Sequence, residues 1–176
     1  MNGLRNAVLA DVPALQRLIS RSGRELSLPY YTPVQAEAIT RHVFGVDTQL
    51  IQDHTYFLIE QDDVVTACGG WSKRQTLFGG DQVKTGPDPL LDPARDPARV
   101  RAFFVDPART RQGLGRRLMQ ECAEKARASG FKALELVSTL PGEPLYLASG
   151  FVICERFELS LPGGVQVPVS RMRRLL

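Results

Sequence analysis

The fold of this chain is decided around one stretch, Arg109-Thr110-Arg111-Gln112-Gly113-Leu114-Gly115-Arg116-Arg117. The stretch separates a predicted strand at residues 100–105 from the clearest predicted helix, at residues 113–128. Two neighbouring glycines let the backbone approach an anion, and the free amides at a helix start point toward it. Arg116 and Arg117 oppose the helix dipole, a conflict that a bound anion would offset. We interpret the stretch as a phosphate-binding turn; a glycine turn with solvated arginines is the alternative.

Two other phosphate-binding loops do not match this stretch. A nucleotide P-loop has Lys and then Ser or Thr after its glycines, and no such pair follows Gly115. A dinucleotide fingerprint needs a third glycine at the position that Leu118 occupies.

Around the turn, the predicted elements form an α/β domain. A strand at 132–137 follows the helix, so residues 99–137 form a strand–helix–strand unit with parallel strands. Frequent Gly and Pro predict a long loop at about 72–97. A mixed sheet with helices packed on it is the natural assembly. The other predicted elements are a strand at 4–8, helices at about 11–27 and 32–44, a hairpin at 55–60 and 64–71, a short helix at 143–149 and strands at 151–158 and 165–171.

Length and composition limit the class of protein. The chain has 176 residues, of which 43% are hydrophobic, so we expect one globular domain over 1–176. Apolar runs are too short for a membrane helix, and the net charge of +3 is too small to predict nucleic-acid binding. Three scattered cysteines and two isolated histidines predict a reducing, cytoplasmic location and no metal site.

Two further motifs carry a resemblance to a known family. The residues Val105-Asp106-Pro107, followed by the turn 111–116, resemble the acetyl-CoA pyrophosphate loop of the GNAT superfamily of N-acetyltransferases. Leu145-Tyr146-Leu147-Ala148-Ser149-Gly150-Phe151 resembles the family's Tyr-x-x-x-Gly-Phe signature, in the family's order and spacing. The opening segment 4–15 resembles its first strand and helix.

The resemblance implies a fold, a cosubstrate and site residues. The implied fold is a mixed, mostly antiparallel twisted sheet of six to seven strands with about four flanking helices. The cosubstrate is acetyl-CoA. Tyr146 faces its sulfur, and the strand residues Phe103, Phe104 and Val105 pair with its pantetheine arm. The residues that cradle its pyrophosphate are Arg111, Gln112, Gly113, Leu114, Gly115 and Arg116.

Two positions depart from the family pattern. Thr110 stands where the family usually has Gln or Arg, and Thr139 stands where it often has an Asn that contacts pantetheine. Since backbone amides make most contacts in the loop, we expect cofactor binding to survive.

The implied activity is transfer of an acetyl group to a primary amine of a small molecule or peptide by direct attack. A tyrosine with a pKa of about 10 stays protonated at pH 7, so Tyr146 can donate a hydrogen bond to the departing thiolate. The general base stays unidentified, with Glu25, Glu60 and Asp96 as candidates.

The acceptor pocket should lie between the first two helices and the long loop. Its candidate aromatic walls are Tyr30, Tyr31, Trp71 and Phe78. Arg101 could pair with a carboxylate of the acceptor.

Alternatives from other classes stay open at this point. A non-catalytic acyl-CoA-binding or regulatory domain would use the same loop and lack an acceptor pocket. A nucleic-acid-binding module would use the arginines of the turn and Arg171-Met172-Arg173-Arg174, but the small net charge argues against it. We expect neither a nucleic-acid nor a membrane partner, and a homodimer is left open.

Overall fold

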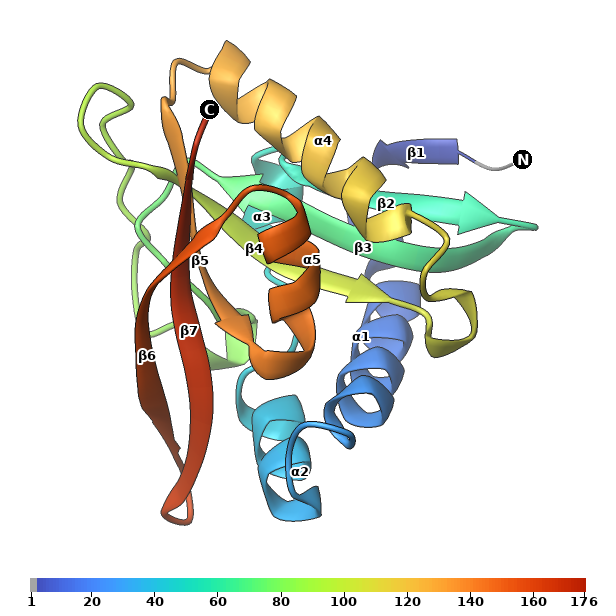
Figure 1. Cartoon of the computed structure of the whole chain (residues 1–176). Coiled ribbons are helices and arrows are strands. Elements are labelled where there is room, and N and C mark those ends of the chain that lie inside the picture. Colours follow the sequence, from blue (N-terminus) through green and yellow to red (C-terminus); the bar gives the residue numbers. More distant parts are fainter. Residues whose placement is uncertain (1–2) are drawn as a thin grey trace.

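The computed structural model describes residues 3–176, and one sheet of seven strands runs through them (Figure 1). The predicted single domain spans 1–176, and its residues 1–2 lie outside this described part. The strands are β1 (Gly3–Asn6), β2 (Tyr56–Gln61), β3 (Val64–Ser72), β4 (Ala98–Val105), β5 (Ala133–Thr139), β6 (Val152–Leu161) and β7 (Val165–Leu175). Their order in the sheet is β1-β2-β3-β4-β5-β7-β6. Only β4 and β5 pair in parallel, so the prediction of a mostly antiparallel sheet is confirmed.

Five α-helices flank the sheet within residues 3–176, one more than expected. They are α1 (Val12–Ser27), α2 (Pro33–His42), α3 (Thr48–Gln52), α4 (Leu114–Ala128) and α5 (Glu143–Ala148). The unforeseen helix, α3, is too short to show a helical period in the sequence. Asp47 caps it by accepting a hydrogen bond from the Gln49 amide, and Leu50 and Ile51 bury its inner face.

The helices cover opposite faces of the sheet because side chains alternate along each strand. Phe57 and Ile59 of β2 pack in one apolar cluster with α4, whereas Tyr56 and Leu58 pack in another with α1 and α3. The cluster on the α4 face also contains Tyr146 of α5, and a third cluster joins α2 to β7. Figure 1 shows α4 and α5 on the near face, with α1 and α2 extending below.

The parallel pair β4 and β5 stays together for only two residue pairs. Ala98 pairs with Leu134 and Arg99 with Glu135, and beyond these the strands diverge (Figure 1). On its other side β4 stays paired with β3 as far as Val105, and β5 stays paired with β7 as far as Thr139. The sheet therefore has an internal opening, and the β4 backbone that faces it lacks a strand partner.

A bulge in β4 sets the direction of the strand at this opening. Between the pairs Cys68–Phe104 and Gly70–Arg101, β4 has one residue more than β3. Ala102 takes up the extra length with φ of 53°, in the left-handed region that residues other than glycine rarely adopt. The Tyr56 hydroxyl donates a hydrogen bond of 2.8 Å to the Ala102 carbonyl, which holds the bulge from beneath.

Arg101, next to the bulge, anchors the long loop to the sheet. The side chain of Arg101 is almost fully buried and donates to Asp47 Oδ2 at 2.9 Å. It also donates to the carbonyls of Gly79 and Thr76, and Lys84 pairs with Asp47 from the loop. The partner of Arg101 is thus Asp47, and not the acceptor carboxylate that we considered for it. The loop from residue 73 to residue 97 contains a single 3-10 turn, Asp81–Val83, and a bridge between Arg74 and Leu90.

Two searches of the described residues bear on the class of protein. None of the helices in residues 3–176 has both the length and the apolar character for a membrane crossing. No group of three His, Cys, Asp or Glu side chains in the same residues is arranged to hold a metal ion.

Breaking the buried ion pair should destabilise the protein more than breaking an exposed one. Arg101→Leu leaves Asp47 buried with Lys84 as its remaining cation, and removing one partner of a buried pair costs roughly 3–5 kcal/mol. We expect a loss near the lower end, about 3 kcal/mol, in the free energy of unfolding measured with urea. Arg95→Leu is the control, because the Arg95–Asp92 pair is exposed and should contribute at most about 1 kcal/mol. Equal losses in the two variants would contradict this account of Arg101.

Candidate active site

The opening between β4 and β5 is the entrance to a cavity of about 690 Å³. Residues of both strands line it, together with the start of α4, α5, the inner sides of α1 and α2, and Leu77, Phe78 and Gly79 of the long loop. The cavity therefore passes through the sheet, from the face that carries α4 and α5 to the face that carries α1 and α2.

The two glycines of the phosphate-binding turn are required for different reasons. Gly113 precedes α4 with φ of 80°, no side chain caps the helix there, and the space where a Cβ would project is empty. The first amides of α4 have no partner within the helix, so they are free to bind an anion. At Gly115 a Cβ would come within 2.9 Å of Leu145 Cδ2, so this glycine lets α4 pack closely on α5.

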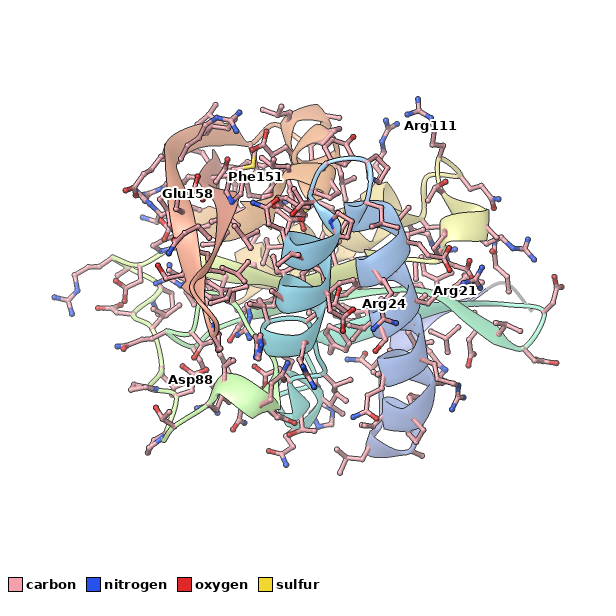
Figure 2. The ribbon with its side chains drawn as sticks, turned by 90° about the horizontal axis from the view of Figure 1, so that it is seen from below. Arg21, Arg24, Asp88, Arg111, Phe151 and Glu158 are labelled. Carbon is pink, nitrogen blue, oxygen red and sulfur yellow. The ribbon has the colours of Figure 1, made fainter. Side chains whose placement is uncertain are left out.

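Three arginines that lie at this end of the cavity have no acidic partner. Arg109, Arg111 and Arg116 line the cavity, and none of them forms an ion pair with any residue of 3–176. Figure 2 shows Arg111 projecting from the turn away from the body of the protein. Gln112, which we expected to contact the pyrophosphate, is exposed and does not line the cavity, whereas Gly113, Leu114 and Gly115 do. Unpaired cations beside free helix amides fit an anionic ligand such as a diphosphate.

The expected pantetheine strand borders the cavity. Phe103, Phe104 and Val105 all line it, and the β4 backbone facing β5 is unpaired at these residues. Because of the alternation, the ring of Phe103 lies 6.2 Å from that of Tyr146, and the ring of Phe104 lies 5.0 Å from that of Phe44. Aromatic packing thus holds both faces of β4 while its edge stays free for an extended ligand.

Tyr146 is a cavity residue whose hydroxyl has no partner in the described residues. Its ring packs edge-on against Phe103 and Phe151, at centroid distances of 6.2 and 5.8 Å. The side chain lines the cavity, and its hydroxyl makes no hydrogen bond to the described residues. Burial raises the pKa of Tyr146 well above its ordinary value, since the phenolate would lose its hydration. Tyr146 is therefore a protonated donor throughout the neutral pH range.

Two residues expected to contact the acceptor, Tyr31 and Trp71, lie outside the cavity. The Tyr31 hydroxyl donates to the Pro168 carbonyl at 2.7 Å and accepts from the Leu140 amide at 2.9 Å. These two bonds tie the segment before α2 to β7 and to the end of β5. Burial raises the pKa of Tyr31 to about 12. Trp71 packs in the core against Phe131, with ring centroids 6.0 Å apart. Neither side chain lines the cavity.

The three acids considered as bases also lie outside the lining of the cavity. Glu25 pairs with Arg21 on the surface of α1, and Glu60 pairs with Arg5 near the β1 edge of the sheet. Asp96 accepts a hydrogen bond from the Asp92 amide within the long loop. None of them is in place to take a proton directly from a molecule in the cavity.

The structure adds wall residues that sequence reasoning missed. Leu26, Ile39, Val43, Phe44 and Leu159 line the part of the cavity beyond the sheet, and of the expected walls only Phe78 joins them. In the sequence these residues have the spacing of ordinary core positions. What distinguishes these wall residues from core residues is that they lie beside the opening between β4 and β5.

Solved structures share this fold over the whole chain. A GCN5-related N-acetyltransferase from Rhodopseudomonas palustris superposes with a TM-score of 0.69 at 16% identity, covering 100% of this chain and 96% of that one. The PaiA N-acetyltransferase of Thermoplasma acidophilum, solved with coenzyme A, gives 0.66 at 11% identity and covers 100% and 99%. YncA of Salmonella typhimurium, a putative acetyltransferase solved with acetyl-CoA, gives 0.65 at 18% identity and covers 100% and 94%.

At these identities the superpositions establish the fold alone, and the family comes from the sequence itself. No curated protein matches the chain significantly. The model of the acetyltransferase (GNAT) family, however, matches residues 17–151, which include β2 to β5, the glycine turn and Tyr146. This chain therefore belongs to the GNAT family of acetyltransferases.

Proposed function

We propose that the cavity binds acetyl-CoA and that the protein transfers the acetyl group to a primary amine of a small molecule or peptide. One observation carries this proposal: a single cavity is lined both by the unpaired arginines of the turn and by Tyr146, whose hydroxyl has no hydrogen-bond partner in residues 3–176. The relatives solved with coenzyme A and acetyl-CoA support the choice of cosubstrate. The free cysteines Cys68, Cys122 and Cys154 fit a reducing compartment, and we propose a cytoplasmic location.

In this proposal each end of the cavity holds a different part of the cosubstrate. The α4 amides after Gly113, with Arg111 and Arg116, bind the diphosphate. The free edge of β4 at residues 103–105 pairs with the amide groups of the pantetheine arm, as an added strand would. The thioester is then held near the Tyr146 hydroxyl.

The chemistry is a direct displacement at the thioester carbonyl. Acetyl-CoA supplies an acyl carbon activated by a thiolate leaving group. The amine nitrogen forms a bond to that carbon, the carbon–sulfur bond breaks, and the proton lost by nitrogen ends on sulfur. No cysteine lines the cavity in the described residues, so no thiol of the protein is available there to carry the acetyl group.

Tyr146 acts in this step as a hydrogen-bond donor. Between an ordinary tyrosine and an ordinary thiol, full proton transfer is uphill by about 1.5 pKa units, or about 2 kcal/mol. Burial raises the pKa of Tyr146 further, so transfer of its proton is still less favourable. The hydroxyl therefore stabilises the charge that develops on sulfur without giving up its proton.

Tyr146→Phe removes this donor and keeps the ring that packs on Phe103 and Phe151. We expect kcat to fall ten-fold or more, with the Kd for coenzyme A changed less than two-fold. The measurement is thiol release at saturating acetyl-CoA, with calorimetry for Kd. A variant with the wild-type rate would remove Tyr146 from the mechanism. Coenzyme A binding with no turnover of any amine by the wild type would favour the non-catalytic alternative.

The double variant Arg111→Gln and Arg116→Gln tests the diphosphate site. We expect its Kd for coenzyme A to rise about ten-fold or more, because each hydrogen bond to a charged group contributes about 1.5–3 kcal/mol before screening. S-acetylpantetheine, which lacks the diphosphate, should react equally well with both proteins. Arg127→Gln, near the other end of α4, is the control and should leave Kd within two-fold. An equal effect on S-acetylpantetheine would place the diphosphate elsewhere.

A further inference from the structure

The part of the cavity on the α1 and α2 face has a distinct chemical character. We call it the acceptor chamber and define it by six side chains: Leu26, Ile39, Val43, Phe44, Phe78 and Leu159. They come from α1, from α2 and the residues that follow it, from the long loop and from β6. None of them comes from α4 or α5. Figure 2 views the molecule from this face, with α1 and α2 side by side toward the viewer. A molecule that reaches the thioester from this face must pass these apolar walls.

No acidic or imidazole side chain of the described residues lines the cavity. The neutral polar side chains of Ser22 and Ser27 on α1, and of Ser138 and Thr139 on β5, also line the cavity. Nearby acids on the helices are directed to other cations: Glu25 pairs with Arg21 and Glu37 with Arg24 (Figure 2 labels both arginines). The chamber therefore has no anion that would attract an ammonium group or receive its proton.

The elements behind the chamber add no free anion to its lining. Asp47, near Gly45 and Gly79, is held by both Arg101 and Lys84. Glu143 at the start of α5 is held by Arg156 and by the Ser170 hydroxyl. Glu158 on β6 is exposed and alternates with the inward-facing Leu159. The charged groups that do line the cavity are Arg109, Arg111 and Arg116, at the end where the diphosphate is proposed to bind, and they offer no anion to the acceptor.

These surroundings select the protonation state of the acceptor. An ammonium group that enters an apolar chamber loses its hydration without gaining a partner, which is costly and lowers the pKa of the amine. A neutral amine avoids this penalty, and its reaction is balanced in protons, because the proton that nitrogen loses is the one that sulfur gains.

We propose that the acceptor is an apolar monoamine that enters the chamber as its uncharged free base, having lost its proton to solvent beforehand. The inference rests on the proposed function and adds the substrate class to it. Polyamines and other polycations are poor acceptors, because a second ammonium group would have no counter-charge. No side chain of the protein sets the pH dependence of the reaction between pH 6 and 9.5.

Two amines with the same aromatic body but different basicity provide the test. The probes are 2-phenylethylamine, an alkylamine with a pKa of about 10, and L-phenylalaninamide, an α-amine with a pKa of about 8. We expect kcat/KM from thiol release to rise about ten-fold per pH unit for each amine, up to the pKa of that amine. The profile for L-phenylalaninamide should flatten near pH 8, and that for 2-phenylethylamine should still rise at pH 9.5. Spermidine at pH 7.5 should react at less than a tenth of the rate of 2-phenylethylamine.

Several results would overturn the inference while leaving the acetyltransferase activity in place. A break at one shared pH in both profiles would mean that a group of the protein takes the proton. Spermidine as the best acceptor would mean that the chamber accepts cations. A rate that rises ten-fold when hexanoyl-CoA replaces acetyl-CoA, and that is the same for amines with and without an aromatic ring, would mean that the chamber binds the acyl chain. Thiol release with none of the three amines, despite coenzyme A binding, would instead contradict the proposed function itself.

A matched pair of variants tests the chamber by gain of function. Leu26 lines the chamber and is partly exposed on α1, so we expect a side chain of similar length to fit there. Leu26→Glu introduces the missing carboxylate, and Leu26→Gln introduces the same shape without the charge. We expect kcat/KM for spermidine at pH 7.5 to be at least ten-fold higher in the Glu variant than in the Gln variant. Equal values in the two variants, both folded by circular dichroism, would show that the amine does not pass through this chamber.

Discussion

The separation of β4 from β5 after only two paired residues is the constraint on which the rest of this structure depends. A parallel pair buried in a sheet normally keeps its ladder, because an unpaired backbone group away from water costs free energy. Here β4 keeps its partner β3 and β5 keeps its partner β7, so the sheet stays intact while one row of backbone groups faces a cavity. A ligand with its own amide groups can satisfy that row. The opening also connects the two faces, so that in the proposed reaction acetyl-CoA and the acceptor approach one carbon atom from opposite sides.

Buried polar contacts on the α1 and α3 face of the sheet hold β4 in place beside this opening. The bulge at Ala102 places Arg101 and Ala102 on the same face, where Tyr56 holds one carbonyl and Asp47 holds one guanidinium. Through Gly79 and Thr76, the same arginine fixes the loop that carries Phe78 into the chamber. An apolar interior makes such contacts strong and makes their loss costly. The wall of the acceptor chamber is therefore coupled to β4, the strand that we propose borders the thioester.

The parts of the site that follow from local sequence could be predicted, and the parts that follow from packing could not. The glycine turn and Tyr146 lie in short motifs whose chemistry depends on neighbours in the chain, and the structure places both at the cavity. Arg101, Tyr31 and Trp71 are candidates because each is a charged or aromatic residue in a segment that could reach the acceptor. The neighbouring sequence does not show which face of the sheet each side chain occupies. For Arg101 the bulge breaks the alternation that would have been used to assign its face. Leu26 and Phe44 could not be recognised, because an apolar wall of a cavity and an apolar core position have the same sequence pattern.

A crystal structure of the complex with coenzyme A tests the central claim most directly. The account predicts density for the diphosphate against the amides of residues 113–116, for the pantetheine arm along β4 at residues 103–105, and for the sulfur within hydrogen-bonding distance of the Tyr146 hydroxyl. Density for the diphosphate away from the start of α4, or a pantetheine arm that lies outside the opening between β4 and β5, would contradict it.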